Sequence, residues 1–129
     1  MRWIPTIAVL LALLPAQALA AGKPMTITTA GQKGVPSLTK PVKGKVLSST
    51  FGPGTTVVTI TGLHTSYVFS FRGGTIKMGA DPTLDAKMNV VGKWKITGGT
   101  GRFAGITGTG TMKGSLTGKP FVFSGHYQQ

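Results

Sequence analysis

The stretch ITGGTGRFAG, residues 96–105, decides between two folds for this chain. It contains a Gly-x-Gly-x-x-Ala pattern at Gly99, Gly101 and Ala104, which cradles a dinucleotide pyrophosphate when a strand precedes it and a helix follows it. The preceding KWKIT is a good strand, but the following GITGTGTMKGSLTG is rich in glycine, and each glycine inside a helix costs about 1 kcal/mol relative to alanine. No acidic residue follows Asp85 to bind a ribose. The stretch therefore predicts a tight strand-to-strand connection instead of a cofactor loop.

The glycines of this stretch are expected to be turn and packing residues. Gly98, Gly99, Gly101 and Gly105 offer positions for positive φ or for a close backbone approach, and Phe103 returns an apolar anchor before the next strand. We expect a positive φ for at least one of Gly98, Gly99 and Gly101, with Phe103 buried.

Period-two alternation recurs along the rest of the chain, and helical periodicity is absent. The predicted strands are residues 46–51, 55–61, 65–72, 74–79, 84–91, 92–97, 106–114 and 119–127. Turn residues separate most of them, which is typical of a meander of antiparallel strands that ends as a sandwich or a closed barrel. The sequence therefore predicts an all-β domain.

Aromatic residues dominate the faces that alternation turns inward. They are the core, or the lining of a ligand cavity, and comprise Tyr67, Phe69, Phe71, Trp94, Phe121, Phe123 and Tyr127. Most lysines fall on the opposite faces or near strand ends, namely Lys77, Lys87, Lys93, Lys95, Lys113 and Lys119.

The first 45 residues predict export and a mobile arm. Residues 1–20 combine Arg2, an apolar run and an Ala-x-Ala site, the pattern of a signal peptide cleaved near Ala20. Residues 21–45 are rich in Gly, Pro and Lys and are expected to form an extended basic arm, which leaves residues 46–129 as the barrel domain. The chain has no cysteine, so no disulfide stabilises it. We expect a periplasmic or extracellular protein.

Residues 95–110, KITGGTGRFAGITGTG, resemble the motif of the allene oxide cyclase barrel and dirigent-like families, in particular their small exported bacterial members. The resemblance implies a single eight-stranded antiparallel barrel with an apolar interior, and a homo-oligomer as in plant relatives. Relatives include cyclases and dirigent proteins that steer radical coupling. The catalytic glutamate of the plant cyclases has no counterpart, because the sequence contains no Glu.

Charge is the strongest compositional signal for function. The sequence contains fourteen Lys and Arg residues and only two acidic residues, Asp81 and Asp85, so its formal net charge is +12. Such a surface attracts polyanions and anionic envelope components. The aromatic residues alternate inward, so the exposed rings that stack bases are missing and no specific nucleic-acid readout is expected.

Acid–base and metal-ligating groups are few. The candidates are Asp81, Asp85, His64, His126, Tyr67 and Tyr127. Asp81 precedes Pro82, where an Asp usually makes a turn hydrogen bond, and Asp85 is expected to pair with Lys87. No cofactor and no metal site is expected.

We expect a non-enzymatic exported barrel that binds a small apolar ligand or an envelope partner. Two alternatives stay open at this point. One is a cyclase- or isomerase-like enzyme that shapes a substrate bound in the barrel. The other is a polyanion-binding protein.

Overall fold

A computed structural model describes residues 22–30, 40–62 and 64–129 as antiparallel strands and their connections, with no helix in these ranges. The strands are β1 (Lys23–Thr29), β2 (Val42–Ser48), β3 (Gly52–Thr61), β4 (His64–Phe71), β5 (Gly74–Ala80), β6 (Thr83–Leu84), β7 (Asn89–Gly101), β8 (Thr107–Ser115) and β9 (Val122–Gln128).

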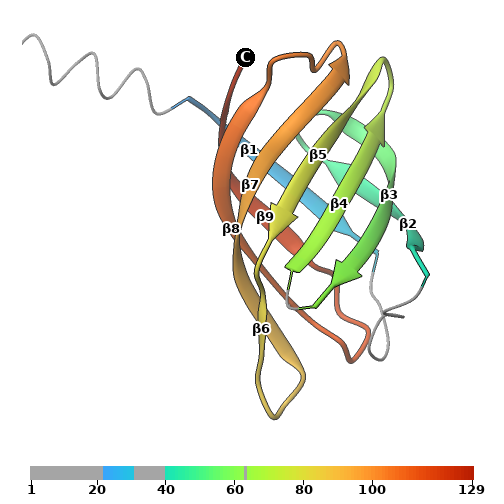
Figure 1. Cartoon of the computed structure of the whole chain (residues 1–129), viewed down its shortest axis with the longest axis vertical. Helices are drawn as coiled ribbons and strands as arrows, with labels where there is room; N and C mark the ends of the chain where they lie inside the picture. Colours follow the sequence, from blue (N-terminus) through green and yellow to red (C-terminus); the bar gives the residue numbers. More distant parts are fainter. Residues whose placement is uncertain (1–21, 31–39, 63) are drawn as a thin grey trace, which may run out of the picture.

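Eight of the strands form a closed barrel, as the sequence predicts. Around the ring they follow the order β1, β2, β3, β4, β5, β7, β8, β9, each antiparallel to its neighbours, and β9 pairs with β1 to complete the ring. The short β6 pairs with β7 alone and lies outside the ring. Its hairpin with the start of β7 extends past the other strands at one end of the barrel, opposite the C-terminus (Figure 1).

The structure differs from the prediction at the arm. Lys23–Thr29 form β1, paired on one side with β2 and on the other with β9, and Ile27 is fully buried. β2 begins at Val42, also inside the predicted arm. Met25, Ile27 and Thr29 alternate as in a strand. Hydrogen-bond ladders with β2 on one edge and β9 on the other stabilise this segment in spite of its polar composition. Residues 1–21, including the predicted signal peptide, and residues 31–39 lie outside the described residues.

A second difference concerns the two strands predicted at 84–91 and 92–97. The chain turns at residues 85–88 and then continues as one strand, β7, from Asn89 to Gly101. Val90 and Trp94 both face the interior along this strand, so Gly92 between them continues the strand instead of turning it.

The stretch 96–105 contains a β-bulge and a tight loop. Lys77 pairs with Gly98 while Met78 pairs with Ile96, which leaves Thr97 as the extra residue on β7. Past the bulge, Gly101 has φ +60° and the Arg102 amide donates to the Gly73 carbonyl. Phe103 is 2 % exposed. Both expectations, a positive φ at one of the glycines and a buried Phe103, are confirmed.

Buried aromatic and aliphatic side chains pack against one another in the interior. Tyr67 and Phe69 stack in parallel at 5.8 Å, and Phe123 meets both rings edge-on at 4.9 and 5.5 Å. Such edge-on and offset contacts stabilise aromatic pairs beyond their buried area.

Glycines on β8 and β9 make room for the largest side chain of the core. A Cβ on Gly110 would lie 2.4 Å from Cζ2 of the Trp94 indole, and one on Gly125 would lie 2.7 Å from the same atom. Trp94 is 2 % exposed, and its Nε1 donates to the Thr111 carbonyl at 2.9 Å. The indole therefore lies directly on a wall without side chains, which only glycine permits.

A second aromatic cluster closes the barrel at the C-terminal end, where β9 ends and β1 begins. Phe51, from the β2–β3 turn, contacts Phe103, Tyr127 and Phe71 at 5.1, 5.2 and 5.6 Å between ring centroids. The Ser48 hydroxyl fixes this turn by accepting hydrogen bonds from the amides of Thr50 and Phe51. We call these four rings the aromatic plug.

The contact between Gly110 and the Trp94 indole predicts that a methyl group added at Gly110 lowers stability more than one added at a strand glycine with free space around it. Gly110→Ala should lower the free energy of unfolding by about 1 to 3 kcal/mol, because the new Cβ meets the indole and the Ser124 carbonyl. Urea unfolding followed by circular dichroism measures the change. Gly44→Ala is the matched control: Gly44 also lies on a strand, but its Cβ would meet only Thr56 Cγ2, at 3.6 Å. Equal losses in both variants would contradict this account of the core.

Candidate functional site

Most of the aromatic residues that were predicted to form the core or to line a ligand cavity pack together in the core. Tyr67, Phe69, Phe71, Trp94 and Phe123 are buried, whereas Phe121 and Tyr127 are partly buried and pack against the core from its two ends. The rings contact one another and the aliphatic core residues. Their packing role is clear, and a ligand-binding role stays a prediction.

Thr56 and Tyr67 place polar groups inside this apolar interior. The Thr56 Oγ1 atom is buried and has no hydrogen-bond partner among the described residues. The Tyr67 hydroxyl has Met112 Sδ as a weak acceptor at 3.9 Å. Burial raises the pKa of the Tyr67 phenol well above its ordinary value, an effect that a hydrogen bond with Thr65 only partly offsets. Burial thus favours the neutral phenol of Tyr67 and leaves the Thr56 hydroxyl unpaired among the described residues.

The acid–base candidates do not converge on one site. His64 Nδ1 lies 2.9 Å from Asp81 Oδ1 on the surface, because Thr65 stands opposite Ala80 and the next residues beyond this pair are His64 and Asp81. Asp81 thus pairs with this histidine instead of making the expected turn bond.

Asp85 also differs from expectation, because its carboxylate accepts hydrogen bonds from the amides of Lys87 and Asn89 and makes no ion pair with the Lys87 ammonium. These bonds hold the pKa of Asp85 below its usual range, the amide of Asn89 most strongly.

Within the described residues, no three His, Cys, Asp or Glu side chains gather as a metal site, and no helix is long and apolar enough to cross a membrane. His126 faces outward on β9 and stands opposite Thr109 on β8.

Four exposed lysines form a diagonal line across the outside of the barrel, as their strand parity predicts. Lys95 on β7 stands opposite Gly79, and Lys77 lies two residues from Gly79 on β5. Lys93 stands opposite Thr111, and Lys113 lies two residues from Thr111 on β8. Diagonal and alternate neighbours in a sheet lie roughly 7 to 8 Å apart. We call the set Lys77, Lys95, Lys93 and Lys113 the lysine ridge.

Hydroxyl groups flank the ridge on its β8 side, and Asp81 lies at its β5 edge, next in register to Lys93 because Ala80 stands opposite Trp94. Thr109 and Thr111 on β8 face outward beside Lys95 and Lys93, and Ser124 on β9 follows in the same row as Thr111. Both acidic residues of the sequence lie in the connection from β5 to β7, where Asp81 pairs with His64 and Asp85 holds a turn. The ridge ammonium groups therefore have no ion pairs within the described chain.

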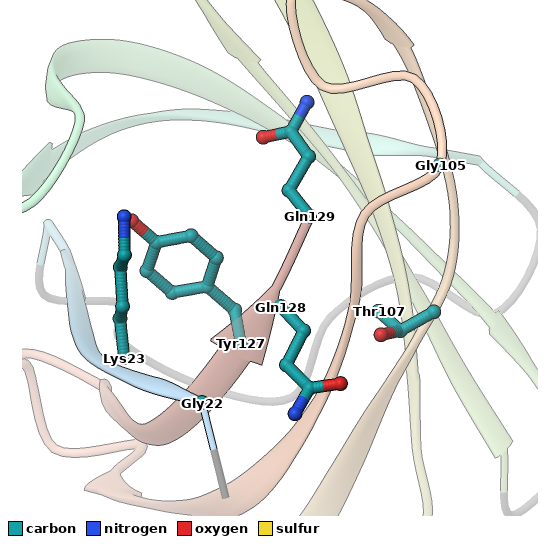
Figure 2. A pocket seen from close by; sticks show the side chains of 7 residues that line it. All are labelled: Gly22, Lys23, Gly105, Thr107, Tyr127, Gln128 and Gln129. Atoms are coloured by element: carbon teal, nitrogen blue, oxygen red, sulfur yellow. The ribbon is translucent and has the colours of Figure 1, made fainter. Parts of the chain in front are cut away.

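A pocket of about 790 Å³ opens on the rim at the C-terminal end of the barrel. Its lining comes from the start of β1, the start of β8 with the loop before it, and the end of β9: Gly22, Lys23, Gly105, Thr107, Tyr127, Gln128 and Gln129. In Figure 2, the ammonium of Lys23 lies beside the hydroxyl of Tyr127, and the side chains of Thr107 and Gln128 lie close to one another. The register explains both pairs, since Lys23 is opposite Tyr127 and Thr107 is opposite Gln128.

The floor of this pocket is held in place by the aromatic plug and by the chain end. Tyr127 packs edge-on against Phe51, and the side-chain amide of Gln129 donates to the Arg102 and Ala104 carbonyls. The Arg102 guanidinium lies 4.6 Å from the Phe103 ring centre and donates to the Phe51 carbonyl. Sequence patterns gave no signal for this pocket, because its residues come from three separate segments that only barrel closure brings together.

The class defined by these observations is a closed, eight-stranded antiparallel barrel with a packed aromatic core and exposed lysines on its outer surface. No protein-family model, curated protein or solved structure matches the chain. The resemblance of residues 95–110 to the allene oxide cyclase and dirigent-like families stays a prediction.

The buried Tyr67 phenol predicts a loss of stability at alkaline pH. Its raised pKa means that the folded state keeps a proton that the unfolded state releases above about pH 10, so stability falls as pH rises, by at most about 1.4 kcal/mol per pH unit. Tyr67→Phe removes this contribution, whereas lysine titration affects both proteins alike. The unfolding free energy of the variant relative to wild type should rise between pH 10 and 11.5 in urea titrations. A constant difference across this range would show that Tyr67 ionises as it does in the unfolded chain.

Proposed function

We propose that this protein is a non-enzymatic binding protein that holds acidic polymers of the cell envelope on its lysine ridge. The observation that carries the proposal is the line of four exposed ammonium groups on adjacent strands, with no carboxylate on any barrel strand. The predicted signal peptide of residues 1–20 would deliver the protein to the compartment where such polymers occur.

The spacing of the ridge suits a linear polyanion. Successive lysines are roughly 7 to 8 Å apart, about one Debye length at physiological ionic strength, so a polymer along the ridge interacts with several ammonium groups at once. The threonine and serine hydroxyls beside them can donate to and accept from polymer oxygens. Compact, strongly hydrated lysine ammonium groups favour attraction to charge over the reading of bases, for which arginine forks are better suited.

The absence of an assembled acid–base constellation in the described residues is why we do not propose a cyclase or isomerase. His64 and Asp81 lie on the exposed surface, and Tyr67 is enclosed by the core. These groups lie in separate places, and none of them lines the rim pocket.

The role of the ridge can be tested by comparing two variants that lose the same number of lysines, one on the ridge and one elsewhere on the surface. Replacing the four ridge lysines with glutamine should weaken binding to heparin, used as a generic acidic polymer, by about 100-fold or more at low salt, because each lysine near an anionic surface contributes on the order of 1 kcal/mol. The matched control replaces Lys43, Lys45, Lys87 and Lys119 with glutamine and loses the same charge elsewhere. The salt concentration at which each protein elutes from immobilised heparin measures the difference. Equal elution of the two variants would mean that net charge alone drives retention, and the ridge proposal would fail.

A small apolar ligand inside the barrel is the second candidate, favoured by the unpaired Thr56 hydroxyl. A buried hydroxyl without a partner costs about 1 to 3 kcal/mol, and a ligand with one polar atom would remove that cost.

Native mass spectrometry of protein purified from its own host distinguishes an occupied interior from an empty one. A reproducible extra mass that disappears in Thr56→Val would support the ligand. A clean apo mass, with Thr56→Val more stable than wild type by about 1 kcal/mol, would argue against it.

A further inference from the structure

The rim pocket lies within reach of a polymer held on the lysine ridge. Thr107, which lines the pocket, is two residues along β8 from Thr109, and Thr109 stands directly opposite Lys95. Thr107 and Lys95 are therefore diagonal neighbours on the outer surface, roughly 7 to 8 Å apart. No acidic side chain lies between them on the described strands.

The pocket offers one cation and several neutral hydrogen-bonding groups. The Lys23 side chain is exposed and has no ion pair among the described residues, and both acidic residues of the sequence lie at the opposite end of the barrel, in the β5–β7 connection. The Tyr127 hydroxyl lies beside its ammonium, whereas Thr107 contributes a hydroxyl from the outward-facing side of the wall, across β9 (Figure 2). A ligand that matches this pattern carries one negative charge and several hydroxyl groups on a compact frame.

We propose that the rim pocket binds one acidic sugar unit, with its carboxylate on Lys23 and a ring hydroxyl on Tyr127, and that Thr107 on the outer side of the rim contacts the next unit of the same chain. The proposal rests on the function proposed above and names the polymer as an acidic polysaccharide, of which this unit is a part. The pocket volume of about 790 Å³ lies within the range of small-molecule sites and leaves room for a sugar and its neighbour in the chain.

The lining favours a sugar over a nucleotide or a lipid chain. Single-stranded nucleic acids bind to proteins by stacking bases on exposed aromatic faces, but the only ring in this lining, Tyr127, is packed against Phe51 in the aromatic plug. A lipid chain needs an apolar lining, and the pocket has no aliphatic side chain larger than the stem of Lys23. Hydroxyl, amide and ammonium groups instead match the oxygen-rich surface of a sugar acid.

A short and a long form of one acidic polysaccharide test the pocket and the ridge separately. Tetragalacturonate is short enough to report on the pocket, and polygalacturonate is long enough to cover the ridge as well. We expect tetragalacturonate to shift the backbone NMR signals of Lys23, Thr107 and Tyr127. Lys23→Gln should weaken its binding at least tenfold, because a charge-assisted bond is lost. Tyr127→Phe should weaken it less, and Lys43→Gln, the control with the same charge loss on β2, should leave it within twofold.

Binding of polygalacturonate should depend mainly on the four lysines of the ridge. Its retention should fall far more with the four ridge substitutions than with Lys23→Gln, because Lys23 supplies one of several contacts with the long chain. If the long polymer depends on the ridge but the tetramer leaves the pocket signals unmoved, or binds Lys23→Gln as well as wild type, the pocket inference is overturned and the ridge function stands. If the tetramer binds at the pocket but the long polymer ignores the ridge, the proposed function is the one that fails. A single-stranded DNA tetramer that binds the pocket as tightly as the sugar would also overturn the assignment to an acidic sugar.

Discussion

The Trp94 indole lies on the glycine wall of β8 and β9, and the outside of the barrel is arranged around this contact. An eight-stranded barrel is just wide enough for side chains to fill, so a large group that lies across the neighbouring strands requires residues with little or no side chain there. Gly110 and Gly125 meet that requirement. Because side chains alternate along a strand, an inward Trp94 turns Lys93 and Lys95 outward. The two central lysines of the ridge therefore owe their positions to a core contact.

The same rule positions the ends of the ridge. Lys77 lies between the buried Ile76 and Met78, and Lys113 follows the buried Met112. Each ridge lysine is adjacent in sequence to a core residue, so substitutions that loosen the core would also disturb the surface line of charge. Packing and binding are thus linked through strand parity, without any direct contact between the lysines and the interior.

The two ends of the barrel differ in kind. At the C-terminal end, the rings of the aromatic plug pack against one another, and Tyr127 among them lines the rim pocket. At the other end, the β6–β7 hairpin extends outward and holds both acidic residues, Asp85 in its turn and Asp81 just before it. Lys23 therefore lies at the opposite end of the barrel from both carboxylates, whereas Asp81, paired with His64, lies beside Lys93 at one edge of the ridge.

Strand parity, turn glycines and composition determined the all-β class, the buried aromatic rings, the outward lysines and the buried Phe103, because each depends on alternation within one segment. Tertiary structure alone decided that Lys23–Thr29 belong to the barrel, since their stability comes from ladders with β2 and β9 that are distant in sequence. It also decided the His64–Asp81 pair, the bulge at Thr97 and the rim pocket. In each case the partners come from separate segments, and closure of the ring, with its particular register, is what brings them into contact.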